Sequence, residues 1–146
     1  MTVEITPLES VTPDVVEAFE RLLPQLSARA PEIGEGELKR VAAWQGATVL
    51  LARLDGRIVG TLTLVLFPIP TGTRAWIEDV VVESSARGNG VGAALVHHAL
   101  DLAREAGART VDLTSRPSRV FAHRLYESVG FEVRDSRLYR YELSRP

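Results

Sequence analysis

The sequence predicts one mixed α/β (α+β) domain over residues 1–146, in which about four helices flank a mostly antiparallel sheet of about seven strands. Apolar residues recur at helical spacing in several segments, whereas the other apolar runs are short and bounded by turn residues. The pair Asp55-Gly56 separates two of these short runs, which is typical of a two-residue hairpin. A length of 146 residues corresponds to about one domain.

The N-terminal half of the chain predicts strands and two helices. Thr12 is a favourable N-cap, Pro13 takes the first helical position, and Pro24 ends the first apolar helical pattern. The elements expected in this half are strands at 2–7, 48–54, 57–67 and 74–83 and helices at 13–23 and 36–44.

The C-terminal half predicts helices that alternate with short strands. Gly107 ends the first of these helices, and Gly130 is the expected C-cap of the second. The elements expected in this half are helices at 90–106 and 118–129 and strands at 109–114, 131–133 and 137–143.

Composition excludes several classes of protein. A hydrophobic fraction of 45% with 25% charged residues is that of a soluble globular domain, and the chain has no cysteine for a thiolate metal site or nucleophile. A net charge of -2 argues against a general nucleic-acid binder. No apolar run reaches the ~20 residues that span a membrane, and the N-terminus lacks a signal-peptide pattern, so we expect a cytoplasmic protein. Lys39 is the one lysine beside many arginines, which is typical of GC-rich bacterial coding.

A glycine-rich turn between a buried strand and a helix is the most informative segment. Its residues are Arg87, Gly88, Asn89, Gly90, Val91, Gly92 and Ala93. Exposed amides at a helix start, together with the helix dipole, form a site for an anion such as phosphate. The first acidic residue after Gly90 is Asp101, so no side chain of the first turn competes with an external anion. The alternative is that the glycines only allow a tight turn and close helix packing.

Two other phosphate-binding turns fit the sequence less well. Gly88, Gly90 and Ala93 match the spacing of a dinucleotide-binding turn, with Asp112 near the distance expected of a ribose-binding acid. However, polar residues 83–86 separate the strand from the first glycine, and the chain that follows is too short for repeated βαβ units. A mononucleotide P-loop is excluded because no Gly-Lys-Ser/Thr follows.

Two motifs resemble those of the GNAT superfamily of acetyl-CoA-dependent N-acetyltransferases. Arg87-x-x-Gly90-x-Gly92 is similar to the first motif of that superfamily. The second, on the helix that ends in Gly-Phe, is matched by Ala122-x-x-Leu125-Tyr126-Glu127-x-x-Gly130-Phe131. The resemblance implies the GNAT fold along nearly the whole chain. It also implies acetyl transfer from acetyl-CoA, without a metal, to a primary amine of a small molecule or peptide, by direct attack in a ternary complex.

The resemblance also implies roles for individual residues. The backbone of Val80, Val81 and Val82 would hold the pantetheine arm in a gap where this strand splays from the next one. Residues 87–93 would hold the pyrophosphate, and Tyr126 would lie near the thioester sulfur. The alternative function is a GNAT-like regulatory module that binds an acyl-CoA without turnover.

Acetyl transfer requires a base and an acid. A free alkyl amine has a pKa near ~10.4 and must lose a proton, and the departing thiolate gains from a donor such as the Tyr126 hydroxyl. Glu78 and Asp79 are the candidate bases, expected on opposite faces of their strand. Ile77-Glu78-Asp79-Val80 resembles glucosamine-6-phosphate N-acetyltransferases, which suggests an amino-sugar acceptor. Structural salt bridges are the alternative for both acids, and a core tyrosine bonded to a carbonyl is the alternative for Tyr126.

Other polar residues have more than one interpretation. Many GNAT proteins carry a cofactor-binding Asn where this chain has Arg119. Arg119 and its neighbours Arg116, Ser118 and Arg124 either contact the phosphates of CoA or form a solvated basic face. The adjacent His97 and His98 are a poor metal pair, whereas His123 is placed to contact cofactor or substrate.

The apolar pattern also leads to two expectations about packing. Phe121, Leu125 and Val129 are expected to point inward from the helix that carries Tyr126. A homodimer is expected through the apolar strands at 61–67 and 139–143, which could pair across a sheet edge.

Overall fold

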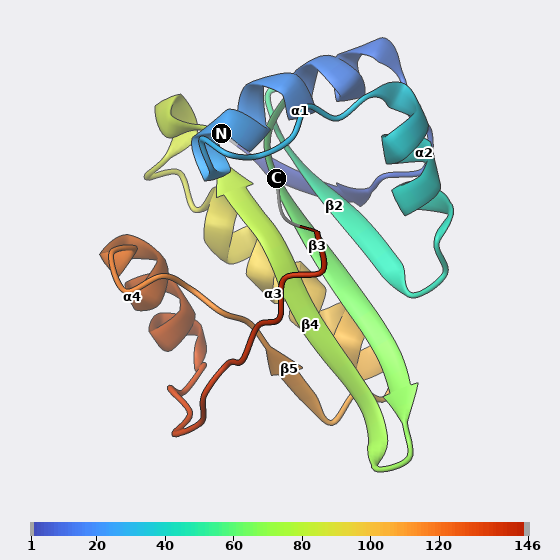
Figure 1. The fold of residues 1–146 in the computed structure, drawn as a ribbon. Coiled ribbons are helices and arrows are strands. Elements are labelled where there is room, and N and C mark those ends of the chain that lie inside the picture. Colours follow the sequence, from blue (N-terminus) through green and yellow to red (C-terminus); the bar gives the residue numbers. More distant parts are fainter. Residues whose placement is uncertain (1, 145–146) are drawn as a thin grey trace.

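The computed structural model describes residues 2–144, which form one open five-stranded sheet in the order β1-β2-β3-β4-β5 (Figure 1). The strands are β1 (Val3–Pro7), β2 (Ala47–Leu54), β3 (Arg57–Ile69), β4 (Gly72–Val82) and β5 (Thr110–Asp112). The helices are α1 (Pro13–Leu26), α2 (Glu35–Ala43), α3 (Val91–Glu105) and α4 (Val120–Val129), with a short 3-10 helix η1 (Ser84–Ala86) after β4. The pairs β1-β2, β2-β3 and β3-β4 are antiparallel, and β5 runs parallel to β4.

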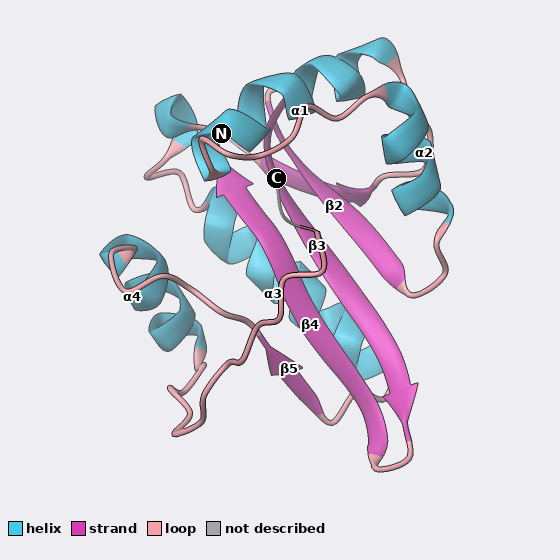
Figure 2. Cartoon of the chain, viewed as in Figure 1, coloured by secondary structure: helices cyan, strands magenta, loops and turns pink. Residues whose placement is uncertain are grey.

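Helices cover both faces of this sheet, as Figure 2 shows. Leu50 of β2 and Leu95 of α3 belong to the core on one face, together with Leu62 and Leu64 of β3. Leu51, the neighbour of Leu50, faces the other way and packs with side chains of α1 and α2. Successive side chains of a strand therefore pack into the two cores on opposite faces of the sheet, and the strands carry long apolar runs because both faces are buried.

Local sequence signals account for most of the element boundaries. The hairpin between β2 and β3 turns at Asp55 and Gly56, both with positive φ, as a two-residue turn requires. Thr12 is the N-cap of α1, although its hydroxyl contacts the Asp14 carboxylate and caps no backbone amide. The expected end of α1 at Pro24 is wrong, because the helix continues to Leu26, whose side chain packs against the core beneath it.

The last two expected strands, at 131–133 and 137–143, are wrong for the described chain. Within residues 2–144 the structure has no strand after β5, so the sheet has five strands where about seven were expected. Tyr139, Tyr141 and Leu143 keep the alternation of a strand, yet all three side chains are exposed. Alternation of side chains alone does not make a strand, and within residues 2–144 this segment pairs with no edge of the sheet.

The described helices are all too short or too polar to cross a membrane.

Candidate functional site

The candidate site lies where β4 and β5 separate. The two strands pair only from Arg74 to Trp76 on β4 and from Thr110 to Asp112 on β5. Beyond Trp76, β4 keeps β3 on one side, but no described strand pairs with its other side. The backbone of Val80, Val81 and Val82 therefore has a free edge, as the expected gap between the strands requires.

A β-bulge interrupts β4 at this free edge. Thr63 of β3 pairs with Glu78, whereas Thr61 pairs with Val81, so β4 carries one extra residue between these two pairs. Asp79 lies there with a φ of 51°, in the left-handed region. The extra residue reverses the alternation of side chains: Ile77 packs in the core under α3, whereas Val81 packs in the core under α1.

The bulge bears on the expected placement of the two acids, because it falls at one of them. Regular alternation would put Glu78 and Asp79 on opposite faces of β4, but regular alternation ends at Asp79. Both residues are exposed, and neither forms a salt bridge within residues 2–144. The alternative that these two acids serve as structural salt-bridge partners therefore finds no support. Partial burial raises the pKa of Glu78, and the nearby charge of Asp79 raises it further, whereas the Trp76 side chain and the charge of Arg140 lower it in part.

The glycine turn presents the N-terminus of α3 without a protein cap. Gly90 is the N-cap of α3, with a φ of 76°, and no side chain among residues 2–144 accepts a hydrogen bond from the first amides of the helix. The first turn of α3 contains no acidic residue. A Cβ atom added at Gly88 or Gly90 would meet nothing within 4 Å, so the space in front of the turn is open. Free amides, a helix N-terminus and an open approach fit a pyrophosphate group.

Tyr126 of α4 is almost fully buried beside this turn. Its ring makes an edge-to-face contact with Phe131, with 5.8 Å between the centroids. Its hydroxyl makes no hydrogen bond to any of residues 2–144, so the carbonyl partner of the alternative interpretation is missing. Burial raises the pKa of Tyr126, and the positive charge of Arg119 lowers it in part. The raised pKa favours the protonated form of this hydroxyl.

The inward position expected for Phe121 is wrong. Its side chain is 84% exposed, and the Arg124 guanidinium lies over its ring at 5.8 Å from the centroid. Leu125 and Val129 do pack against the core, as expected. The core-facing stripe of α4 therefore contains Ala122, Leu125, Tyr126 and Val129 and leaves out Phe121.

Three arginines of this region are exposed: Arg116 in the loop before α4, Arg119 at its start and Arg124 within it. Arg119 is the N-cap residue of that helix. Of the three histidines, His97 is exposed and the other two are partly buried. No group of three or more His, Asp or Glu side chains is arranged to hold a metal ion within residues 2–144.

One polar atom near the site was not found from the sequence. The Ser115 hydroxyl, in the loop from β5 to α4, is buried and has no hydrogen-bond partner within residues 2–144. Buried hydroxyls normally have a partner, so this one favours a ligand group or water beside it. Nothing in the sequence around Ser115 distinguishes it from the other polar residues of this loop.

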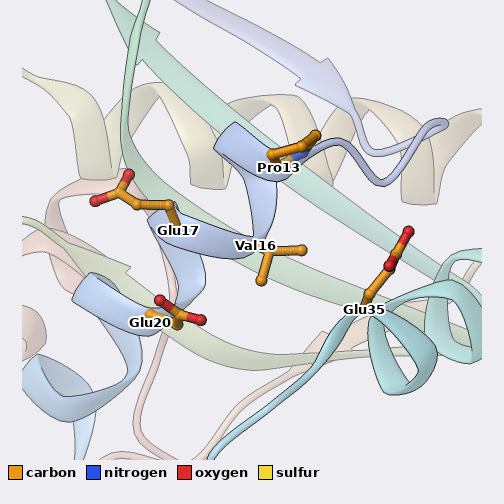
Figure 3. A pocket seen from close by; sticks show the side chains of 5 residues that line it. All are labelled: Pro13, Val16, Glu17, Glu20 and Glu35. Atoms are coloured by element: carbon orange, nitrogen blue, oxygen red, sulfur yellow. The ribbon is translucent and has the colours of Figure 1, made fainter.

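A hollow of about 310 Å³ lies apart from the glycine turn, between α1 and the start of α2 (Figure 3). Its lining residues are Pro13, Val16, Glu17, Glu20 and Glu35. Two of its three carboxylates have cationic partners, since Glu17 binds Arg21 at 2.6 Å and Glu35 binds Lys39 at 3.0 Å. We assign no ligand to this hollow.

The chain is similar to known acetyltransferases. The profile of the acetyltransferase (GNAT) family matches residues 14–131. Glucosamine 6-phosphate N-acetyltransferase of Trypanosoma brucei brucei is 32% identical over 117 residues, which cover 75% of this chain and 78% of that protein. An uncharacterized N-acetyltransferase of Bacillus subtilis, YhdJ, is 40% identical over 73 residues, which cover 49% of this chain and 51% of that protein.

The fold is also found among solved structures. A transcriptional regulator from Bacillus halodurans superposes with a TM-score of 0.79 at 27% identity, over 95% of this chain and all of that one. The family profile spans the chain from the start of α1 to Phe131, immediately after α4, and includes both motifs of the candidate site. This chain therefore belongs to the acetyltransferase (GNAT) family and is an acyltransferase of the N-acetyltransferase type.

Proposed function

We propose that this chain transfers the acetyl group of acetyl-CoA to a primary amine of a small molecule or peptide, by direct attack in a ternary complex. The observation that carries the proposal is the uncapped N-terminus of α3 at Gly90, beside the free edge of β4 and the unbonded hydroxyl of Tyr126. The three features offer a site for a phosphate, a strand edge for an extended amide chain and a proton donor.

The residues of the turn would hold the pyrophosphate of acetyl-CoA through their amides, with Arg87 as a cation at its mouth. The residues assigned to this role are Arg87, Gly88, Asn89, Gly90, Val91, Gly92 and Ala93. The side chain of Val91 is buried, so it would act through its backbone alone. The free backbone edge at Val80, Val81 and Val82 would pair with the amides of the pantetheine arm. Arg119 and the Ser115 hydroxyl would meet the same ligand from the α4 side.

The acid and the base of the reaction come from opposite sides of the gap. Acetyl-CoA supplies the activated acyl group, whose C–S bond breaks as the C–N bond to the acceptor forms. Glu78 or Asp79 takes a proton from the amine, directly or through water, and Tyr126 gives one to the departing sulfur. Solvent then carries a proton from the carboxyl group back to Tyr126, which restores both residues. A backbone amide at the bulge of β4 would stabilise the developing oxyanion.

Amino sugars are the first acceptors to test. The T. brucei relative is named a glucosamine 6-phosphate N-acetyltransferase, and the run Ile77-Glu78-Asp79-Val80 resembles that group. The acceptor panel would contain amino sugars and their phosphates, aminoglycosides, polyamines, amino acids and peptides. Mass spectrometry of each mixture with acetyl-CoA identifies any acetylated product. Initial rates with both substrates varied would give intersecting lines for a ternary complex and parallel lines for an acetyl-enzyme.

The alternative is a module that binds acyl-CoA for a regulatory purpose without turnover. The similarity to a structure named a transcriptional regulator keeps this function open. Calorimetry separates the two. A chain that binds acetyl-CoA and acetylates no member of the panel is such a module, whereas product with any acceptor supports the enzyme.

A homodimer remains part of the proposal. The expected contribution of residues 61–67 is wrong, because β3 lies inside the sheet between β2 and β4 and has no free edge. Residues 139–143 have unpaired backbone and are self-complementary. In an antiparallel two-fold pair centred on Tyr141, Arg140 stands opposite Glu142 of the second copy and Tyr139 opposite Leu143. Sedimentation at micromolar concentration would give a dimer, and a monomer of 16.0 kDa would contradict the pairing.

A further inference from the structure

The carboxylate of Glu83, directly after β4, is held by three side chains from different parts of the chain. Its Oε1 atom accepts hydrogen bonds from Arg21 Nη1 at 2.6 Å and from Arg57 Nη2 at 2.8 Å. Its Oε2 atom accepts one from the Ser85 hydroxyl at 3.2 Å. The Glu83 side chain is only 9% exposed, so both oxygens exchange most of their water for protein donors.

Hydrogen bonds continue from this carboxylate to the glycine turn. On the α1 side, Gln25 Oε1 accepts the Ser84 amide at 2.9 Å. Next, the Ala86 amide donates to the Glu83 carbonyl at 2.9 Å, and Asn89 Nδ2 donates to the Ala86 carbonyl at 2.9 Å. Asn89 is itself part of the turn. A continuous path therefore connects α1, through η1, to the N-terminus of α3.

The glycine turn depends on these hydrogen bonds for its conformation, because its glycine residues do little to restrict it. Gly88 and Gly90 lie in open space, and a glycine backbone has more conformations to lose than any other. Binding a pyrophosphate would have to order a free loop, which costs conformational entropy for each residue that is fixed. A loop whose first residues are already bonded to α1 and β3 avoids part of this cost.

We propose that Glu83 is a positioning residue for the glycine turn, which it fixes in the shape that binds the pyrophosphate of acetyl-CoA by accepting hydrogen bonds from Arg21 and Arg57. This role rests on the proposed function of the turn. It differs from an electrostatic role, because a carboxylate near an anion site repels the anion. Removing the charge at Glu83 would tighten CoA binding if charge decided the affinity, and would weaken it if position did.

The test is the affinity for CoA of the Glu83→Gln variant, measured by calorimetry well below its melting temperature. The amide of Gln keeps one acceptor oxygen but loses the charge that strengthens the bonds from Arg21 and Arg57, and its NH2 group cannot accept from Ser85. The dissociation constant should therefore rise about tenfold, as expected for a displaced binding loop. In steady-state kinetics the KM for acetyl-CoA should rise by the same factor, while kcat and the KM for the acceptor stay near the parent values. A merely structural role would lower kcat with the folded fraction and leave both KM values unchanged.

Further variants distinguish the hydrogen bonds that position the turn from neighbouring interactions that do not. Glu17→Gln removes the other partner of Arg21, at 2.6 Å, and should leave CoA affinity unchanged. Gln25→Ala removes the second α1 contact from an exposed position, and should weaken CoA binding even if Glu83→Gln does not fold. Arg21→Met combined with Glu83→Gln should weaken binding little more than either change alone, because the two residues act as a unit.

The outcomes also separate this role from the function of the turn. A parent protein that does not bind CoA overturns both proposals. A parent that binds CoA, with a folded Glu83→Gln variant of equal or tighter affinity, overturns only the positioning role of Glu83. If Glu83→Gln does not fold, parental affinity in Gln25→Ala overturns it.

Discussion

Gly92 of α3 and Leu125 of α4 lie so close that a Cβ atom added to Gly92 would be 3.0 Å from Leu125 Cδ2. Gly92 belongs to the glycine turn motif, and Leu125 precedes Tyr126. The contact therefore connects the proposed phosphate site with the proposed proton donor, and the absence of a side chain at Gly92 sets the distance between the two helices.

Gly92→Ala should lower activity more than stability. Alanine favours a helix over glycine by about 1 kcal/mol, but the new methyl group would push Leu125 by a few tenths of an ångström. Displacement of the adjacent Tyr126 should lower kcat by roughly two- to tenfold. Gly36→Ala in α2 is the matched control, because a Cβ there meets nothing within 4 Å. The control should stabilise the fold by about 0.5–1 kcal/mol in thermal unfolding at unchanged kcat. Equal kcat in both variants would contradict the proposed contact.

Tyr126→Phe should remove the proton donor and little else. The hydroxyl has no hydrogen-bond partner within residues 2–144, so its loss should cost little stability or CoA affinity. The value of kcat should fall by about 10²-fold, the lower range of general acid catalysis. Tyr141→Phe, at an exposed tyrosine, is the control and should behave as the parent. Single-turnover rates decide the case if product release limits kcat, and parental single-turnover rates would exclude Tyr126 as the acid.

The pH profile should identify the base. A carboxylate accepts a proton only when ionised, so kcat/KM should rise as the pH passes the pKa of the base. Burial and the charge of Asp79 raise the pKa of Glu78 above its ordinary value of 4.5. If Glu78 is the base, the rising part of the pH profile should therefore lie above pH 4.5. Glu78→Gln should remove that rise. Asp79→Asn is the paired variant, because Asn tolerates the positive φ of the bulge. If the rise of kcat/KM with pH is still present in Glu78→Gln and is absent in Asp79→Asn, the base is Asp79.

Stability in acid should depend on Glu83. The Arg57 guanidinium, followed by Arg21 and the Ser85 hydroxyl, holds the pKa of Glu83 below its ordinary value of 4.5. The folded protein therefore binds the proton less readily than the unfolded chain does, and this contribution is present above pH 4.5 and lost as the pH falls through the folded pKa. Below pH 4.5, the free energy of unfolding measured with denaturant should fall less steeply with decreasing pH for Glu83→Gln than for the parent. Parallel curves would show that the ion pairs add nothing to stability.

Sequence patterns predicted the elements that depend on local signals. The Asp55-Gly56 hairpin, the helices around the two motifs and the Gly130 cap are set by periodicity and turn residues, and all are present. The bulge at Asp79 could not be predicted, because it depends on the register between β3 and β4. The strand expected at 137–143 failed for the same reason, since alternation describes side chains and not the partner edge.

The anchor at Glu83 shows a second limit of the sequence. Its partners Arg21 and Arg57 are far away along the chain, and only the packing of α1 beside β3 brings them together. A cluster of residues that are distant in sequence cannot be predicted from their spacing. The motifs of the site are contiguous in sequence and could therefore be recognised. Phe121 was misplaced because the width of an apolar stripe does not show how much of a helix is covered.

Gly90 and Gly107 offer a matched pair for the central claim. They lie near the two ends of α3, both with a φ of 76°, and a Cβ at either meets nothing within 4 Å. Glutamate at either position should cost about 1–2 kcal/mol of backbone strain. Only Gly90→Glu places a carboxylate where the pyrophosphate would bind, and like charges in contact cost several kcal/mol.

The most direct measurement is amine-dependent release of the CoA thiol from acetyl-CoA, compared among the parent, Gly90→Glu and Gly107→Glu with the full acceptor panel. We predict release by the parent with at least one amine, nearly parental release by Gly107→Glu, and a loss of about 100-fold or more in kcat/KM for acetyl-CoA in Gly90→Glu, as expected for juxtaposed like charges. Equal release by Gly90→Glu and Gly107→Glu, or no release by the parent with any amine, would contradict the account.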